Sequence, residues 1–579
     1  MEKKGILAII LTFIIIIGWS FIQSKLFPPE PVKEVKKEQV VPLEQKKETF
    51  QAKAAPSKEP KSTPESKAAS NVKEVATKEV SVETNNYWAV LTNQDAKLKH
   101  FKLKKYKNRV EESSMTITLT RFVEGILGNK TAEPKKPEPL DLINTNEDEG
   151  LPLGLSSQSP FVAGNWDVDK EKISLVRPGE NGEVTFEKEL ENGLKVVKRY
   201  RFHSEDEIID IDIEVQNPTS KEVTLQLGLE WIGKIDLAKL ADEGNKDFGL
   251  RYAFLKNEKV EKKEFGGASS GGCVPSCGPQ SKTIQPFEFS DNGNIKWFSF
   301  GGEYFCALLI PPPAVKSVSL SVKGNAKDIL QATLSLTPST ILPQQSVKIP
   351  YRVYLGPKAE KPLKAIGVEA EKLIDFGWFT VVAKPLLWFI NLTHTATKNY
   401  GIDIILISIL IKLIFLPLTQ ISFKSMKEMQ KVQPEMARLR ETYKNDKARL
   451  QQEIMLLYKR RKVNPMSGCL PMVIQIPFFI ALYNALQNTI EMRHAPFLWW
   501  IQDLSAKDPI YITPIIMGAT MVIQQKMTPT TADPSQAKMM LMMPVVFTFM
   551  FLNFPSGLVL YWMVNNILTI GHQYYMNKK

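Results

Sequence analysis

The sequence predicts a multi-domain protein with an α-helical membrane core, a large all-β domain outside the cytoplasm and a basic two-helix hairpin inside it. Apolar runs approaching membrane thickness occur at the N-terminus and in the last third of the chain. Between them, residues 85–357 repeatedly alternate apolar and polar side chains, a pattern typical of half-buried strands. A short connection, 424–462, holds twelve Lys or Arg against five Asp or Glu, an excess that indicates the cytoplasmic side.

Composition limits the class of protein further. A chain of 579 residues has room for two or three domains. Its net charge of +12 is concentrated in a few segments, so it does not indicate a nucleic-acid-binding protein, and we expect no DNA partner. Four cysteines are too few for a disulfide-stabilised scaffold.

The first element is an apolar run from Ile6 to Ile22 that follows Lys3 and Lys4. Its length of about 17 residues exceeds a usual signal-peptide core, and no small-x-small cleavage pattern follows it. We therefore predict a retained transmembrane anchor over 1–27 whose start is cytoplasmic, with a cleavable signal peptide as the alternative. Residues 28–84, rich in Lys, Glu, Pro, Ala and Ser, predict a disordered linker.

The next domain, 85–357, is expected to be a mostly antiparallel β-sandwich. Ile209, Ile211, Ile213 and Val215 alternate with Asp210, Asp212 and Glu214, and a second alternating run extends from Val223 to Trp231. The domain shows no catalytic pattern, so we expect a structural or docking role, with sugar binding as an alternative. Within it, Cys273 and Cys277 lie in a glycine-rich loop and could form a local disulfide. A metal site would need two further ligands that are not found nearby, and none is predicted.

Residues 358–396 mix aliphatic and tryptophan side chains with Lys, Asp and Glu. This composition favours an amphipathic helix at the outer membrane–water boundary, although a helix buried against the β-domain would also fit.

The membrane core is predicted over 397–579. Apolar runs at 401–418, 469–486, 511–525, 541–554 and 558–570 supply the second to sixth spans, which place both termini in the cytoplasm. The fifth run is short, at roughly 21 Å as a helix, and would thin the bilayer around it.

Between the second and third spans, 423–463 predicts a cytoplasmic hairpin of two helices. Apolar residues recur at helical spacing on both sides of a turn at 444–447. The basic residues give either a solvated face or a docking arm for ribosomal RNA, anionic lipid or an emerging chain. They are Lys424, Lys427, Lys431, Arg438, Arg440, Arg449, Arg460 and Arg461.

Lys412 is the main candidate functional residue. It lies near the middle of the second span, where an unpaired lysine costs about 2.5–3.5 kcal/mol on insertion scales. Asp403 is nine residues earlier, about 13 Å along a helix, and is therefore too far away to neutralise it. We expect Lys412 to face a water-filled groove; extension of its side chain to the inner interface is the alternative.

Further polar residues in the spans could line the same groove, or could form hydrogen bonds between helices instead. They are Ser408, Gln475, Gln524, Gln525, Asn565, Asn566 and Gln573.

Several long motifs occur in order through the second half of the chain. They include Asp375-Phe-Gly-Trp, Pro417-Leu-Thr, the run 464–471 (Asn-Pro-Met-Ser-Gly-Cys-Leu-Pro), Gln475-Ile-Pro-Phe and 554–561 (Phe-Pro-Ser-Gly-Leu-Val-Leu-Tyr). In these motifs the membrane half resembles the YidC/Oxa/Alb family of membrane protein insertases. The whole chain resembles the bacterial members that carry a large periplasmic domain, with a weaker likeness over 85–357.

The resemblance implies a bacterial inner-membrane protein with a periplasmic β-supersandwich and five helices that form the insertase core. It implies a groove with a positive residue on the second span, commonly arginine and here Lys412, and an aromatic position on the sixth span at Tyr561 or Trp562. Nascent membrane proteins, the Sec translocon and membrane lipids are the implied partners, and the ribosome is a further candidate. No enzymatic activity is implied, and no phosphate-binding G-x-x-x-x-G-K-[ST] motif or other cofactor signal is present in the sequence.

Three other functions are alternatives to membrane protein insertion. Ser408 and Lys412 are four residues apart on one helix face, as in a Ser–Lys hydrolase, but no oxyanion site is indicated. A transporter usually shows two similar halves, and no such repeat is found. The third is a carbohydrate-binding module on a membrane anchor.

Overall fold

The computed structural model describes residues 76–111, 114–127, 136–157, 164–235, 251–264, 286–325, 327–461, 463, 470–527 and 534–578. The chain divides into two compact units, Met1–Val72 and Lys73–Lys579, and every described residue belongs to the second. The predicted anchor 1–27, most of the predicted linker 28–84, and Cys273 and Cys277 lie outside the described residues.

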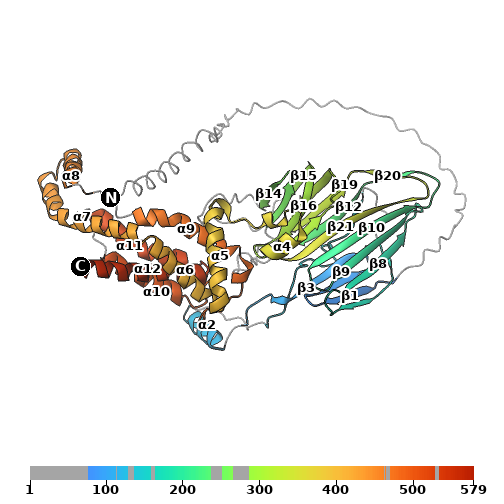
Figure 1. The fold of residues 1–579 in the computed structure, drawn as a ribbon, viewed down its shortest axis with the longest axis horizontal. Helices are drawn as coiled ribbons and strands as arrows, with labels where there is room; N and C mark the ends of the chain where they lie inside the picture. Colours follow the sequence, from blue (N-terminus) through green and yellow to red (C-terminus); the bar gives the residue numbers. More distant parts are fainter. Residues whose placement is uncertain are drawn as a thin grey trace, which may run out of the picture. The chain divides into compact units, whose positions relative to one another are not determined.

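The first part of the second unit is rich in β-strands (Figure 1). Its longest sheet, within the described residues, has the strand order β14-β13-β16-β17-β21-β10-β9-β8-β6, and two five-stranded sheets have the orders β15-β18-β19-β12-β5 and β4-β3-β2-β1-β7. The strands are β1 Glu79–Thr84, β2 Tyr87–Thr92, β3 Lys97–Lys107, β4 Pro139–Asp141, β5 Leu155–Ser157, β6 Asp167–Val168, β7 Lys172–Leu175, β8 Asn181–Glu189, β9 Lys195–His203, β10 Ile208–Asn217, β11 Val223–Leu225, β12 Leu227–Lys234, β13 Arg251–Lys256, β14 Lys259–Glu264, β15 Phe287–Gly293, β16 Ile295–Gly301, β17 Phe305–Ile310, β18 Val318–Gly324, β19 Ile329–Leu336, β20 Ser339–Ile341 and β21 Gln345–Pro357. A helix, α2 Ser114–Leu127, lies between β3 and β4.

The two smaller sheets pack against the long one through a shared hydrophobic core. Tyr351 on β21 donates its hydroxyl to the Leu334 carbonyl on β19, and Tyr200 on β9 donates to the Ala96 carbonyl between β2 and β3. Because both tyrosines belong to the long sheet, these bonds tie each smaller sheet to it. The domain is therefore a layered sandwich, as predicted.

The alternation seen in the sequence matches the sandwich core. Ile209, Ile211, Ile213 and Val215 on β10 are fully buried. Asp210 and Glu214 on the opposite face form ion pairs with Arg352 and Arg199. A period of two places successive side chains on opposite faces, and only one face of this strand meets the core.

The linker prediction ended too late in the sequence. β1, Glu79–Thr84, pairs with β2 and with β7, so the folded domain begins before residue 85. Its Lys- and Glu-containing sequence resembles the linker in composition, but Val80 and Val82 alternate with polar residues and are buried.

The single amphipathic helix expected over 358–396 is also wrong. This segment forms α4 Glu360–Ile366, the 3₁₀ turns η1 Ala370–Leu373 and η2 Gly377–Phe379, and α5 Thr380–Thr397. Leu363, Ile366 and Leu373 pack on the β-domain with Trp297 and Leu308, whereas α5 packs on the helical core. Gly367, at a φ of 78°, ends α4 because glycine adopts this left-handed backbone without steric cost.

The helical core contains α6 Tyr400–Ile414, α7 Leu416–Thr442, α8 Lys447–Arg461, α9 Leu470–Gln487, α10 Ile512–Met527, α11 Pro534–Phe551 and α12 Ser556–Lys578. α12 packs on α10 and α6, α5 packs on α6 and α9, and α11 packs on α10. The β-rich domain followed by a helical core confirms the predicted fold class in outline.

The predicted second span, 401–418, is broken at Phe415. α6 ends there and α7 continues at 61°, because Pro417 in the first turn of α7 lacks an amide proton and restricts the preceding backbone. Within the described residues, no single helix combines the length and apolar composition of a complete membrane span, and α6 with α7 satisfies both only as a bent pair.

The predicted fifth span, 541–554, starts too late and ends too late. α11 begins at Pro534 and has 18 residues, but its first turns are polar and its apolar part is Met542–Phe551, so the apolar segment is short, as predicted. Pro544 lies inside this helix, and Pro534 begins it at a position where a missing amide proton costs little.

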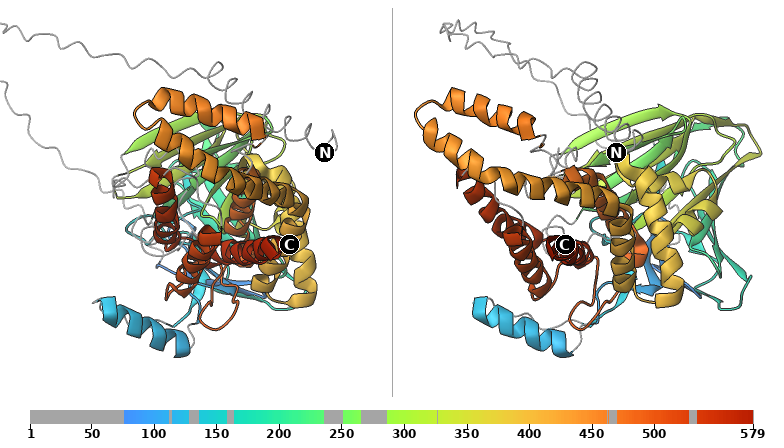
Figure 2. Two further views of the ribbon diagram at one scale, coloured as in Figure 1. Left: turned by 90° about the vertical axis from the view of Figure 1, so that its left-hand side faces the viewer. Right: turned by 60° about the vertical axis from the view of Figure 1, so that its left-hand side comes forward.

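α7 and α8 lie side by side, joined by a turn at 443–446 (Figure 2). Val432 and Met436 on α7 contact Leu457 on α8, and Val463 closes the same small cluster. Val432, Met436 and Leu457 are among the apolar residues that recur at helical spacing in this segment.

Candidate functional site

The outer end of α6 is fixed by polar contacts that position the rest of the helix. Asn399 caps α6 by accepting hydrogen bonds from the Gly401 and Ile402 amides. Asp403 is fully buried and accepts from His394 Nδ1 at 2.9 Å and from the Thr397 hydroxyl at 2.7 Å. The Asp403 carboxylate therefore has both partners on α5. It does not pair with Lys412, which agrees with the long spacing between the two residues in the sequence.

Lys412 lies on α6 two residues before its end. Lys412 is only 7% exposed, and its ammonium donates to the Thr569 hydroxyl on α12 at 2.6 Å. Thr569 in turn donates to the Asn565 carbonyl one turn earlier at 2.6 Å. Within the described residues no carboxylate lies within ion-pair distance of Lys412. The lysine thus differs from the freely hydrated cation we expected, because a neutral hydroxyl from another helix covers it.

Further polar atoms on α12 lack partners near this pair. His572 has both ring nitrogens buried without a hydrogen bond to any described residue, and the Asn565 side-chain oxygen is in the same state. The His572 ring lies 5.2 Å from that of Phe423 and close enough to Lys412 for their charges to interact. Asn565, Thr569 and His572 follow one another at intervals of four and three, so they share one face of α12.

This polar face of α12 was predicted only in part from the sequence. Asn565 was named as a candidate, but Thr569 and His572 were not. The sequence does contain this pattern, because residues 565, 569 and 572 are spaced as on a single helix face. A search of each predicted span for polar residues at this spacing would have found it.

Other predicted groove residues have different roles in the structure. The Ser408 hydroxyl is buried and donates to the Ile404 carbonyl of its own helix at 2.6 Å. Asn566 bonds Thr520 on α10 at 3.3 Å, and Gln573 bonds the Met527 carbonyl at 2.7 Å. These three satisfy hydrogen bonds within or between helices. Gln475 on α9 and Gln524 and Gln525 on α10 are half-buried.

Tyr561 and Trp562 face different neighbours. Tyr561 is 2% exposed and belongs to the cluster that contains Ile407 and Ile411 of α6. The Trp562 ring packs at 5.0 Å from Phe479 and 5.4 Å from Phe551, in a separate aromatic cluster. Of the two, Tyr561 is the one that packs against α6, the helix that carries Lys412.

The outward faces of the core helices expose large apolar side chains. In water each would forgo about 1.5–3 kcal/mol of burial free energy, and a continuous set would favour aggregation. Hydrocarbon is the environment in which such faces are stable. The exposed residues include Leu413 and Ile414 on α6, Ile476 on α9, Ile515 and Ile523 on α10, Val546 and Phe549 on α11, and Ile567 on α12.

The basic residues of α7 and α8 are mostly directed to solvent. Among the eight predicted positions, Lys431 pairs with Glu428 at 2.7 Å and Arg461 pairs with Glu435. Arg440 is half-buried and the other seven are exposed. Both ion pairs are exposed and worth little in free energy, so this surface keeps a strong positive potential.

Two family models match this chain, one over the β-rich domain and one over the helical core. The model described as "60Kd inner membrane protein" matches residues 392–579, and the model described as "YidC periplasmic domain" matches 79–389. The second covers more than half of the chain, and together the two define the class as an inner-membrane protein with a periplasmic domain.

Relatives of the same length specify the family. The "Membrane protein insertase YidC" of Syntrophus aciditrophicus (strain SB) is 41% identical over 100% of both chains, and that of Citrifermentans bemidjiense is 41% identical over 100% of this chain and 99% of the relative. The solved structure titled "Active YidC insertase crystal structure with the first transmembrane domain resolved" is 18% identical with a TM-score of 0.36, covering 86% of this chain and 92% of that one. The chain belongs to the YidC family of membrane protein insertases, which confirms the resemblance and the insertase function predicted from the sequence.

Proposed function

We propose that this chain inserts newly made proteins into the bacterial inner membrane by drawing an acidic client segment to Lys412. The observation that carries this proposal is that the Lys412 ammonium has a neutral acceptor, Thr569, and no carboxylate within ion-pair distance among the described residues. A charge-assisted bond to a carboxylate is about twice as strong as one to a neutral oxygen. A client carboxylate can therefore displace the hydroxyl.

The groove is formed in this proposal by α6 and α12. Lys412 is on α6, while Asn565, Thr569 and His572 share the facing side of α12. Asn565 and His572 supply buried polar atoms without a hydrogen bond to any described residue, and Thr569 bonds Lys412. A client's polar tail would use these atoms in place of water. Its apolar helix would then leave along the exposed apolar faces of the core into lipid, where burial contributes about 25 cal/mol per Å². No nucleotide is required, because this burial supplies the free energy.

The topology belongs to the same proposal. In this proposal α6, α9, α10, α11 and α12 span the membrane and the C-terminus lies in the cytoplasm, while the first span over 1–27 stays a prediction from the sequence. The β-domain, beginning at β1, is periplasmic, and α7 and α8 are cytoplasmic, where basic connections are favoured. α5 lies at the outer interface with Trp388 and Val381 toward lipid; they are 66% and 85% exposed.

The exposed basic surface of α7 and α8 is proposed to dock the ribosome or anionic lipid, and the Sec translocon is proposed as a further partner from the family resemblance. Binding through such a surface depends steeply on salt. Ribosome co-sedimentation that is insensitive both to salt and to the change Arg460→Glu with Arg461→Glu would contradict docking by this hairpin.

The charge mechanism is tested with one client in two forms. The client has a single span and an acidic tail, and its matched form carries Asn and Gln in place of Asp and Glu. Loss of a charged hydrogen bond worth about 1.5–3 kcal/mol should slow insertion of the acidic form roughly 10- to 150-fold in Lys412→Ala, while the neutral form changes little. Lys412→Arg keeps the charge and should retain insertion. Equal insertion of the acidic client by the wild type and Lys412→Ala would refute the mechanism.

The hydrolase alternative is tested with Ser408→Ala. The Ser408 hydroxyl is committed to the Ile404 carbonyl, so its removal should leave insertion near the wild-type rate. A Ser–Lys hydrolase would lose its nucleophile and all activity.

A further inference from the structure

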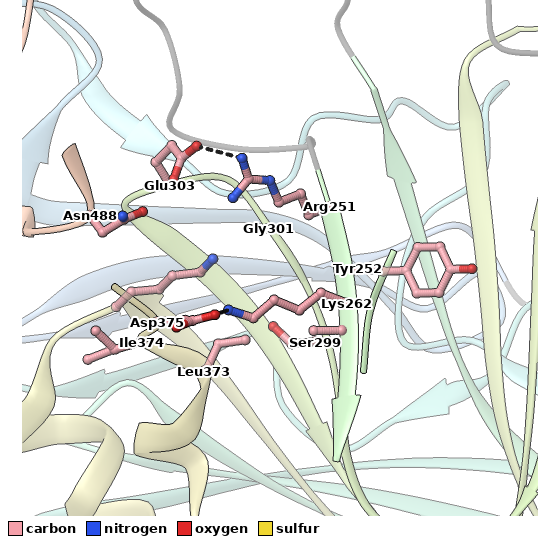
Figure 3. A pocket seen from close by; sticks show the side chains of 12 residues that line it. Arg251, Tyr252, Lys262, Ser299, Gly301, Glu303, Leu373, Ile374, Asp375 and Asn488 are labelled. Atoms are coloured by element: carbon pink, nitrogen blue, oxygen red, sulfur yellow. Dashed lines mark hydrogen bonds and ion pairs between the residues drawn. The ribbon is translucent and has the colours of Figure 1, made fainter. Parts of the chain in front are cut away.

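A cavity in the β-domain gathers basic side chains that the insertion mechanism does not use (Figure 3). It holds about 40 Å³ of space, enough for roughly three water molecules or one phosphate-sized group. Its walls come from β13, β14 and β16, from the segment after β21, and from the η1–η2 connection, with Asn488 at the end of α9.

The charged groups around the cavity do not balance. Arg251 pairs with Glu303 at 3.2 Å and Lys262 pairs with Asp375 at 2.8 Å; both pairs are drawn with dashed lines in Figure 3. Lys358 is the fifth charged group, and its ammonium donates to the Gly302 carbonyl rather than to an acid. Among the described residues that line the cavity, three cations and two carboxylates leave one positive charge in excess.

The excess charge is placed where water screens it poorly. Burial lowers the pKa of Lys358, the neighbouring Cys306 and Glu303 raise it, and the positive charges of Lys262 and Arg251 lower it by smaller amounts. An ammonium offers three donors, and among the described residues Gly302 is the acceptor recorded for it. A bound group with one negative charge and several oxygen acceptors would neutralise the excess and occupy the remaining donors.

The cavity also adjoins an apolar surface. Asp375 accepts a hydrogen bond from the Gly377 amide at 2.8 Å, and Gly377 begins η2, which leads into α5. Trp378, next in the chain, is 75% exposed and Val381 is 85% exposed. An anionic headgroup in the cavity would therefore have its acyl chains beside large exposed apolar side chains.

We propose that this cavity binds the phosphodiester of an anionic phospholipid from the outer leaflet of the inner membrane. A phosphodiester carries one negative charge, which matches the excess, whereas inorganic phosphate carries more and lacks acyl chains. The site would anchor the β-domain and the start of α5 to the membrane surface. This inference rests on the proposed periplasmic side of the domain and on the interfacial position of α5.

The test measures lipid retention on the purified full-length protein by native mass spectrometry. Phosphatidylglycerol is the probe, diacylglycerol is the matched lipid without phosphate, and soluble glycerophosphoglycerol is the headgroup without acyl chains. Lys358→Met should weaken phosphatidylglycerol binding at least tenfold, and Asp375→Asn, which adds net positive charge, should tighten it several-fold. Lys364→Met, an exposed lysine of α4 outside the cavity that pairs with Glu360, should match the wild type.

Opposite effects of Lys358→Met and Asp375→Asn cannot both arise from misfolding, and melting temperatures check each variant. Equal phosphatidylglycerol binding by the wild type and Lys358→Met would overturn the proposal, as would equal retention of diacylglycerol. If glycerophosphoglycerol bound as tightly as the lipid, the cavity would be a site for a soluble phosphate compound. If only an acidic peptide competed, the cavity would be a site for a protein. Either result would overturn the lipid assignment. Lys412→Ala should leave lipid retention unchanged, which separates this result from a failure of the insertion mechanism.

Discussion

Arg493 joins the helical core to the β-domain, and its removal should loosen that junction measurably. The residue follows the 3₁₀ turn η4 Ile490–Met492 and is 9% exposed. Its guanidinium donates to the Lys107 carbonyl at the end of β3 at 2.7 Å and lies 5.2 Å from the ring centroid of Phe305 on β17. On the same turn, Ile490 packs into the β-domain core and Met492 into the helical core.

The expected magnitude follows from these two contacts. A hydrogen bond from a charged donor contributes about 1.5–3 kcal/mol, and a partly buried cation–π contact about 0.5–2 kcal/mol. Arg493→Ala should therefore lower the free energy of opening the junction by about 2–5 kcal/mol. At 1.4 kcal/mol per factor of ten, the open population would rise roughly 30- to 5,000-fold.

Amide hydrogen exchange measures that population directly. The Met492 and Arg493 amides bond the Thr489 and Ile490 carbonyls within the turn, so both should exchange faster in Arg493→Ala, while amides at the centre of β10 should not change. Arg493→Lys keeps the charge without the planar group and should give an intermediate rate. Arg109→Ala, which removes an exposed arginine near the same strand end, is the matched control. Unchanged exchange at 492 and 493 in Arg493→Ala would refute the junction.

A second readout is the titration of His494. Burial, with a smaller contribution from the neighbouring Arg493 charge, lowers the pKa of His494 to about 3. Removing Arg493 should raise this pKa, but burial, the larger cause, should keep it below its ordinary value of 6.5. A His494 pKa that does not move would contradict the close approach of the two side chains.

Two further predictions concern stability. Burial raises the pKa of Glu207 from 4.5 to about 6, so near these pH values the folded state holds a proton that the unfolded state releases. The β-domain should therefore lose about 2 kcal/mol of stability as pH rises from well below 4.5 to well above 6. Urea denaturation of Glu207→Gln should lack this pH dependence, and an identical pH dependence would contradict the assignment. Leu457→Ala removes a buried side chain from the small core between α7 and α8 and should lower the free energy of unfolding of the hairpin by at least about 2 kcal/mol. Faster hydrogen exchange in α8 would report this loss. Leu456, which is 49% exposed, supplies the control, because Leu456→Ala should have little effect.

The β-domain could be predicted well from the sequence because one face of its strands meets the core. The alternation of β10 therefore appeared directly as buried Ile209, Ile211 and Ile213. β1 was missed since only two of its six residues are apolar, and its place in the sheet depends on pairing with β2 and β7, which no local pattern reports.

The helical core was harder to predict, because apolar composition reveals that a helix is buried or in lipid but not which face meets which neighbour. The moderate polarity of 534–540 concealed the first turns of α11, and the break at Phe415 depends on Pro417, which was noted as part of a motif without its effect on the backbone. Lys412 was identified from its charge alone. Its partner Thr569 is 157 residues away, and only the packing of α6 on α12 brings the two together.

The choice of partner explains how a lysine can remain in this core and still be available. A carboxylate fixed opposite Lys412 would form an ion pair too strong for a client to break, and replacing one partner of such a buried pair costs about 3–5 kcal/mol. A hydroxyl accepts a hydrogen bond from one N–H of the ammonium, and this bond contributes less free energy than an ion pair. Thr569 retains its own hydrogen bond to the Asn565 carbonyl when the lysine leaves. In the proposed mechanism, the exchange of Thr569 for a client carboxylate would therefore leave no buried donor without a partner, and the free energy of the stronger bond would favour capture of the client.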